Sequence, residues 1–241
     1  MSALRAKVWY LAHSGFAIQT ENSVLIFDYY LDEPKGGIIT QGVIEPAVLA
    51  EQNVIVFVSH NHDDHFNPVV FDWQKKIPNI RYVLSNDIPT TPNAIMIGPN
   101  ETIRQENFIV TTYKSTDEGV AFLIKIDGLT IYHAGDLNWW HWEGEPEDYN
   151  QQMAVDFKEQ IDMLSNEHVD LAFVPLDPRQ EQQYDWGMKY LLEHVDADNV
   201  IPMHFWGQPD VIDRLLAEPY MNGYAARIRQ LKNRGQYTGI L

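Results

Sequence analysis

The stretch VIVFVSHNHDDH, residues 54–65, decides how the rest of the chain is interpreted. Val54–Val58 is an unbroken apolar run rich in β-branched residues, which is typical of a strand buried on both faces. It leads directly to His60-Asn61-His62-Asp63-Asp64-His65, which holds three imidazoles and two carboxylates within six residues. We therefore predict a turn at the carboxyl end of a buried strand, where ligand sites of layered α/β folds tend to lie.

The side chains of this turn have the chemistry of a metal site, because imidazole nitrogen and carboxylate oxygen are the usual ligands of zinc and related divalent ions. Alternate residues of an extended turn point the same way, so we expect His60 and His62 to approach one ion together. Asp64 and His65 then point across the turn to a second ion. A polar turn with capping side chains is the competing interpretation, but capping does not explain three histidines at this spacing.

The amino-acid composition and net charge favour a folded protein that acts on a small-molecule substrate. With 45% hydrophobic and 21% charged residues, the 241-residue chain can bury a sizeable core, and we expect one domain over residues 1–241. The net charge of −17, from 34 acidic and 17 basic side chains, repels the phosphates of nucleic acids and of anionic membranes. We therefore expect a small-molecule substrate, with neither nucleic acid nor membrane as partner.

The absence of cysteine narrows the chemistry and the location. It excludes disulfides, cysteine-ligated zinc and a cysteine nucleophile, and it fits a reducing compartment. The N-terminus has no apolar stretch of signal-peptide length, and no apolar run approaches the ~20 residues that cross a bilayer. We therefore expect a cytoplasmic protein.

The hydrophobic periodicity predicts a strand-rich first half and a second half in which helices and strands alternate. Helices layered over two sheets would bury the apolar faces of such a chain. We expect strands over 8–18, 24–27, 54–58, 81–84, 94–97, 108–112, 120–126, 129–133, 171–175 and 200–202, and helices over 67–76, 150–166, 184–194, 211–217 and 224–232.

The His60-x-His62-x-Asp64-His65 pattern resembles the signature of the metallo-β-lactamase fold superfamily. The resemblance implies an α/β fold built as a four-layer αββα sandwich. It also implies that His60 and His62 bind one metal, that Asp64 and His65 bind a second, and that Asp64 orients the attacking water and carries its proton.

Three further segments carry the same resemblance in the right order. Ile131–Asp136 is similar to the strand that ends in Gly-Asp, so Asp136 would bridge the two metals. Val200–Phe205 is similar to the strand with the late histidine, so His204 would complete the second site. Leu25–Asp28 resembles the early strand whose aspartate, here Asp28, supports the histidine turn from behind, as carboxylates that orient metal-binding imidazoles do.

One departure concerns the first metal position. The superfamily usually supplies a third histidine from the stretch that corresponds to Thr111–Gly119, and that stretch has none. Three interpretations stay open: a weak first site with one tightly held ion, a replacement side chain, or a site that binds metal without hydrolysis. The candidate replacements are His141, His133 and Asp117. His133 is expected to point to the opposite face of its strand, and Asp117 has turn residues beside it.

Three other residues are candidates near the site. His13 ends a strand and is either a hydrogen-bonding partner of the ligands or a structural histidine. Trp139 either forms an aromatic wall for an organic substrate or packs within its loop. Arg179 is either a clamp for a substrate phosphate or carboxylate, which its planar fork suits, or the partner of Asp177 or Glu181 in an ion pair.

These observations predict a metal-dependent hydrolase of a small ester, lactone or phosphoester. The chain, including His13-Ser14-Gly15-Phe16, most resembles the small bacterial branch that contains L-ascorbate-6-phosphate lactonase and N-acylphosphatidylethanolamine phospholipase D. One or two Zn²⁺ ions are the expected cofactor, and the nitrogen and oxygen donors also suit Mn²⁺ or Fe²⁺. The alternatives are a metal-binding protein without turnover and a phosphodiesterase or nuclease of the same fold, which the acidic charge disfavours.

Overall fold

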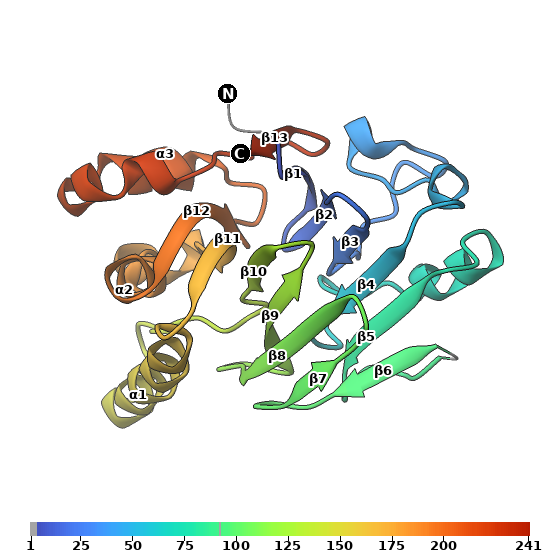
Figure 1. The fold of residues 1–241 in the computed structure, drawn as a ribbon. Coiled ribbons are helices and arrows are strands. Elements are labelled where there is room, and N and C mark those ends of the chain that lie inside the picture. Colours follow the sequence, from blue (N-terminus) through green and yellow to red (C-terminus); the bar gives the residue numbers. More distant parts are fainter. Residues whose placement is uncertain (1–3, 92) are drawn as a thin grey trace.

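The computed structural model describes residues 4–91 and 93–241, and it shows two β-sheets lying face to face (Figure 1). The seven-stranded sheet has the order β13-β1-β2-β3-β4-β5-β6, and the six-stranded sheet has the order β12-β11-β10-β9-β8-β7. Helices α1, α2 and α3 lie outside the six-stranded sheet, and the 3₁₀ helix η3 packs on the other (Figure 1). The expected αββα sandwich is therefore confirmed, with a short 3₁₀ segment in one outer layer.

The strands of the seven-stranded sheet are β1 (Ala6–Ala12), β2 (Gly15–Gln19), β3 (Val24–Phe27), β4 (Val54–Val58), β5 (Arg81–Ser85), β6 (Ala94–Ile97) and β13 (Tyr237–Ile240). Those of the six-stranded sheet are β7 (Thr102–Arg104), β8 (Phe108–Lys114), β9 (Val120–Ile126), β10 (Leu129–His133), β11 (His168–Pro175) and β12 (Asp196–Met203). The helices are α1 (Glu147–Leu164), α2 (Trp186–His194), α3 (Asp210–Ala217), η1 (Ile39–Gln41), η2 (Pro46–Leu49), η3 (Pro68–Lys75), η4 (Pro178–Gln183), η5 (Pro219–Gly223) and η6 (Ala225–Arg227).

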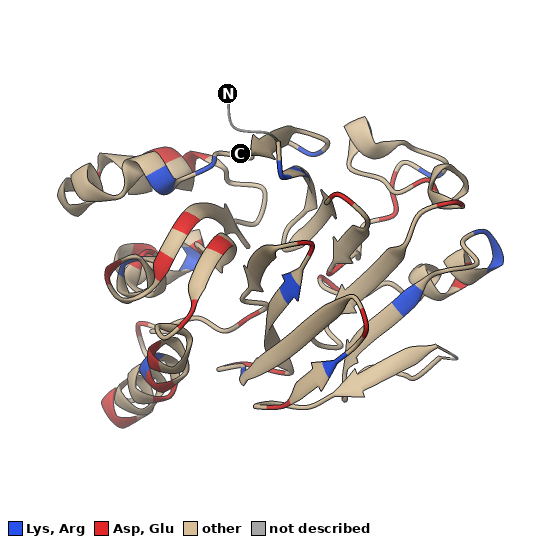
Figure 2. Ribbon diagram, in the orientation of Figure 1, with Lys and Arg blue, Asp and Glu red and all other residues tan. Residues whose placement is uncertain are grey.

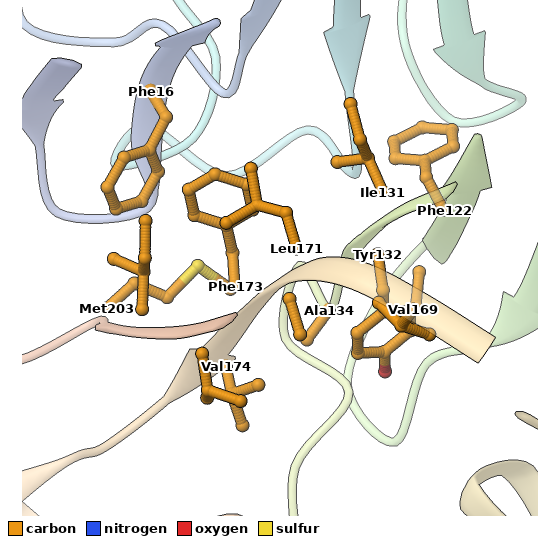
Figure 3. Packing of buried hydrophobic residues seen from close by; sticks show 14 of the residues in the cluster. Phe16, Phe122, Ile131, Tyr132, Ala134, Val169, Leu171, Phe173, Val174 and Met203 are labelled. Carbon is orange, nitrogen blue, oxygen red and sulfur yellow. The ribbon is translucent and has the colours of Figure 1, made fainter. Parts of the chain in front are cut away.

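Aromatic side chains fill the space between the sheets. Phe16 of β2 lies against Phe173 of β11, with ring centroids 4.4 Å apart (Figure 3). Phe57 of β4 meets Phe122 of β9 edge to face at 5.5 Å. These rings are fully buried, and each fully buried large apolar side chain contributes about 1.5–3 kcal/mol. Packing between the sheets therefore holds the strand ends of one sheet against those of the other.

Both sheets place their functional loops at one edge. Strands β3, β4 and β5 pair in parallel, and so do β10, β11 and β12. β2 is antiparallel to both of its neighbours β1 and β3, so β1 runs in the same direction as β3. In the same way β9 is antiparallel to both β8 and β10, so β8 runs in the same direction as β10. The residues that follow these strands therefore emerge together, as expected for the carboxyl edge of layered α/β sheets.

The predicted strand over residues 8–18 is two strands, not one. His13 has φ of 53°, in the left-handed region, so the backbone turns between β1 and β2. A continuous apolar run hides this turn, because Ala12 and Phe16 on its two sides are both buried.

The C-terminal prediction is also wrong in part. Only Ala225–Arg227 of the expected helix over 224–232 is helical, as a short 3₁₀ segment, and Ile228 instead bridges Val200 of β12. The short edge strands β7 and β13 escaped prediction, because their exposed positions carry little hydrophobic pattern.

Asp127 ties two turns together at the edge opposite the functional loops. Its carboxylate accepts hydrogen bonds from Thr20 Oγ1 and, at 3.1 Å each, from the backbone and side-chain nitrogens of Asn22. Burial alone would raise the pKa of Asp127, but these hydrogen bonds outweigh it and hold the pKa below 3.8. The carboxylate therefore stabilises the fold above that pH, and this contribution is lost as pH falls through the lowered pKa.

We expect Asp127→Asn to lower the free energy of unfolding by about 1 kcal/mol at pH 7, since the site is partly exposed. The difference between the two proteins should shrink below pH of about 4. Urea unfolding of both proteins from pH 7 to pH 3 measures it. A difference that stays constant would mean that shape, not charge, carries the effect.

Candidate metal centre

Seven strand ends contribute to one cluster of polar side chains. Each candidate follows its strand by one to three residues, so the sheets themselves set the spacing of the donors. The residues, with their strands, are His13 (β1), Asp28 (β3), His60 (β4), Asp117 (β8), Asp136 (β10), Asp177 (β11) and His204 (β12).

Asp136 stands at the centre of the cluster. Its Oδ1 lies 3.2 Å from Nε2 of His65 and 3.4 Å from Nε2 of His204, and its Oδ2 lies 3.6 Å from Nε2 of His60. All four residues are buried. A buried carboxylate among imidazoles offers the donor types that a divalent ion would use here.

Two buried aspartates hold the imidazoles from behind. Asp28 accepts hydrogen bonds from the backbone nitrogen of Ser59 at 2.8 Å and from its hydroxyl at 2.6 Å, and lies 2.7 Å from Nδ1 of His65. Asp177 lies 3.0 Å from Nδ1 of His204. Because each Nδ1 is engaged by a carboxylate, each Nε2 is directed to the cluster interior with its orientation determined.

The donor set fits a divalent ion. Within the described part of the chain, Nε2 of His13, His60 and His65 and Oδ1 of Asp136 are buried without a hydrogen-bond partner. Buried polar atoms without partners cost about 1–3 kcal/mol each, so four at one place call for a bound group. Three nitrogens and a carboxylate oxygen are the donors that zinc and related ions prefer.

The charges of the cluster are arranged around Asp136. Burial alone would raise its pKa, but the imidazoles of His65 and His204 outweigh it and hold the pKa well below 3.8. Burial lowers the pKa of His60 to about 4, so this imidazole is neutral at pH 7 and its Nε2 lone pair is available to a metal. The cluster is therefore a carboxylate surrounded by imidazoles, and a metal ion that binds there would displace protons from the imidazoles.

The outer part of the cluster contains His62 and the Ser115–Gly119 turn. Asp117, His62 and Asp136 each offer a ligand atom within 4.8 Å of the other two. The backbone nitrogen of Asp117 donates to Ser115 Oγ at 3.1 Å, so Asp117 is a turn residue and also faces His62. The neighbouring carboxylate of Glu118 lies 3.4 Å from Nε2 of His62.

The other histidine candidates for that position lie elsewhere. His133 is fully buried between the sheets, where it stacks on Phe27 at 4.8 Å and where its Nε2 lies 2.9 Å from the carbonyl oxygen of Ser14. His133 therefore packs in the core between the sheets and, in residues 4–91 and 93–241, belongs to none of the groups that could hold a metal. His141 packs against Trp186 at 4.8 Å and belongs to none of the metal-compatible groups among the described residues.

The two predicted substrate-binding residues, Trp139 and Arg179, lie in different places relative to the cluster. Trp139 packs on Phe157 of α1 and Trp186 of α2, away from the central carboxylate. Arg179 forms the ion pair with Asp177 and lies over the ring of Trp206, at 4.4 Å from its centroid. Its side chain is 45% exposed at the rim of the cluster.

The structure places three further residues at the site, of which sequence reasoning missed Ser59 and Trp206 altogether. Ser59 links Asp28 to His60, since its hydroxyl lies 2.9 Å from Nδ1 of His60. Trp140 donates from Nε1 to the carbonyl oxygen of Asp136 at 2.9 Å, and Trp206 stacks edge-on against His13. The available signal was adjacency, because each lies within four residues of a predicted ligand.

Comparison with known proteins agrees with this architecture. The model of the beta-lactamase superfamily domain matches residues 7–204, and the chain therefore belongs to this superfamily. A UPF0173 metal-dependent hydrolase of Thermococcus kodakarensis is 28% identical over 144 residues, which cover 54% of this chain and 61% of that protein. The chain thus spans about 61% of the length of the curated relatives that it matches.

Solved structures show the same fold at low identity. Igni18, a metallo hydrolase from Ignicoccus hospitalis, superimposes with a TM-score of 0.67 at 14% identity over 98% of both chains. The metallo-beta-lactamase fold protein YhfI from Bacillus subtilis gives a TM-score of 0.63 at 13% identity, covering 98% of this chain and 100% of that one.

Among the helices in the described ranges, none is long and apolar enough to cross a membrane.

Proposed function

We propose that this protein is a metal-dependent hydrolase that acts on a small ester, lactone or phosphoester. The observation that carries the proposal is the convergence of His60, His65 and His204 on the buried carboxylate of Asp136, with unpartnered donor atoms facing the interior. The UPF0173 relatives carry the name metal-dependent hydrolase, which supports the same chemistry. Zn²⁺ is the proposed ion, with Mn²⁺ or Fe²⁺ as the alternatives that these donors suit.

Bound divalent ions would make a water nucleophilic near pH 7 and stabilise negative charge on the substrate oxygen. Asp64 is the proposed proton carrier, because its side chain is 29% exposed and so reaches the solvent side of the cluster. Burial alone would raise its pKa, but the nearby imidazoles of His13 and His65 outweigh it and the pKa falls below 3.8. Asp64 is therefore a carboxylate at neutral pH and can accept a proton from the attacking water.

Arg179 and Trp206 form the proposed substrate-recognition face. Asp177 engages Nε and Nη2 of Arg179, and no hydrogen bond among the described residues uses Nη1. A guanidinium donor beside an exposed indole ring suits an anionic group on an organic body. A phosphorylated sugar lactone is one substrate that fits, in line with the sequence resemblance to lactonases.

The charge distribution supports a small substrate over nucleic acid. Figure 2 shows acidic residues on the helices, on the loops and on strands β11 and β12, with basic residues scattered among them. Nucleic-acid affinity depends on gathering Lys and Arg against phosphates. A net charge of −17 opposes that, so a nuclease is the weaker alternative.

Metal content and turnover test the proposal together. Untagged protein purified without chelator should contain about one to two ions per chain by plasma mass spectrometry. It should hydrolyse at least one member of a panel of p-nitrophenyl acetate, a δ-lactone, p-nitrophenyl phosphate and bis(p-nitrophenyl) phosphate. EDTA should abolish the activity and added Zn²⁺ or Mn²⁺ should restore it. Stable metal binding with no turnover would favour the non-catalytic alternative, and protein that binds no metal would contradict the proposal.

A further inference from the structure

The turn at His13, between β1 and β2, has a strained backbone that two hydrogen bonds hold in place. His13 has φ of 53°, a left-handed conformation that costs a non-glycine residue on the order of 1 kcal/mol. Its backbone nitrogen donates to the hydroxyl of Tyr10 at 2.9 Å, and its carbonyl oxygen accepts from the backbone nitrogen of His204 at 3.3 Å. The turn is therefore tied directly to a proposed metal ligand on the other sheet.

The side chain of His13 faces the cluster interior. Its Nε2 is buried without a hydrogen-bond partner and lies 3.3 Å from Oδ2 of Asp64. Its ring centroid lies 4.0 Å from that of His204 and 5.5 Å from that of His65. His13, Asp64, His65 and His204 each offer one ligand atom, and these four atoms all lie within 4.8 Å of one another.

The two halves of the cluster consequently differ in donor type. The inner half, defined here as His13, Asp64, His65 and His204, has three buried imidazoles. The outer half, defined as His60, His62 and Asp117, has two imidazoles, and the side chains of His62 and Asp117 are 41% and 46% exposed. Asp136 lies between the two halves, against His60, His65 and His204. Imidazole is preferred by zinc-like ions, whereas exposed carboxylates hold such ions more weakly and also accept harder ones.

We propose that His13 is a direct ligand of the inner metal position, so that the imidazole missing from the outer position is supplied to the inner one. This inference rests on the proposed metal site and deepens it. The inner position then takes a borderline ion such as Zn²⁺ first and tightly. The outer position, with Asp117 in place of a histidine, takes a second ion with lower affinity.

Replacement of His13 by residues that tolerate the left-handed turn tests the assignment without forcing the backbone to refold. His13→Asn and His13→Gly both accept φ of 53°. Metal-free protein is titrated with Co²⁺ and followed by visible absorption, and protein loaded with one equivalent of Zn²⁺ is studied by X-ray absorption to count imidazole ligands. Asp117→Asn serves as the counterpart in the outer half, and His141→Ala serves as a nearby histidine outside the cluster.

We expect two binding steps in the wild-type protein. Both His13 variants should weaken the first step by roughly 100-fold or more, beyond the 10–100-fold typical of residues that only support a ligand. They should also lose one imidazole from the first zinc ion. Asp117→Asn should weaken only the second step, and His141→Ala should change neither.

The possible failures are distinct. An unchanged first step, or an unchanged imidazole count, in folded His13 variants would overturn the assignment of His13 and leave the metal site standing. Wild-type protein that binds no ion would overturn the proposed function, and the role of His13 with it. Thermal unfolding of the metal-free variants shows whether they are folded, and either of the two variants suffices for the test.

Discussion

Asp136→Asn should remove most of the bound metal and at least about 99% of the hydrolytic activity. Asp136 contacts three imidazoles through its two oxygens, so it is the one side chain shared by the inner and outer halves. Asparagine keeps the shape but loses the negative charge and one acceptor oxygen. Since residues that only support a ligand typically change metal affinity 10–100-fold, loss of the shared carboxylate should exceed that range.

Metal content by plasma mass spectrometry and turnover at saturating metal measure this effect. Asp185→Asn is the matched control, because Asp185 is another buried carboxylate, paired at 2.8 Å with the hydroxyl of Tyr220. It should lower stability without changing metal content. Normal metal content in Asp136→Asn would mean that the ions are held elsewhere.

Gly119→Ala should destabilise the protein by more than about 3 kcal/mol and disturb the position of His60. Gly119 has φ of 68°, and a Cβ there would lie 1.9 Å from the carbonyl oxygen of Ser59 and 2.6 Å from Cβ of His60. Left-handed strain costs alanine about 1–2 kcal/mol, and overpacking against backbone adds about 1–3 kcal/mol. The β8–β9 connection approaches the histidine turn so closely that only glycine fits.

Gly128→Ala is the control that separates the cost of left-handed backbone strain from the cost of the steric clash with Ser59 and His60. Gly128 has φ of 72° and nothing within 4 Å of its added Cβ, so only the backbone strain of about 1–2 kcal/mol should appear. Chemical denaturation of both variants, with metal content measured beside it, gives the comparison. Equal losses of stability would show that the turn yields, and that the contact with Ser59 does not position His60.

Local patterns were enough for the strand-and-turn core of this site. Val54–Val58 is a fully buried strand, as its apolar run predicts, and the turn after it presents His60 and His65 to the interior. Asp136 and His204 were found because each follows a buried strand and because the chain resembles a known superfamily. Positions within a strand and its following turn depend on backbone periodicity, which is a local property.

Predictions failed where an outcome depended on contacts between distant segments. The tryptophan run at 139–142 did not reveal that Trp140 contacts the Asp136 loop while Trp139 packs on α1 and α2. The local backbone makes Trp139 and Trp140 point in different directions. Which of them faces the site depends on how helices α1 and α2 cover the sheet. The turn at His13 was hidden for a similar reason. Its backbone nitrogen donates to the hydroxyl of Tyr10, and its carbonyl oxygen accepts from the backbone nitrogen of His204 on the other sheet.

Side-chain type and the hydrophobic periods of two and 3.6 residues predicted the chemistry of the donors and the strand ends on which most of them lie. The four-layer fold followed from the resemblance of these motifs to a known superfamily. Only the folded arrangement showed that Asp117 faces His62 and that His13 lies with His65 and His204 in the inner half of the cluster. Both depend on the close packing of two sheets, which brings together residues far apart in the chain, such as His13 and His204, which are separated by 191 positions.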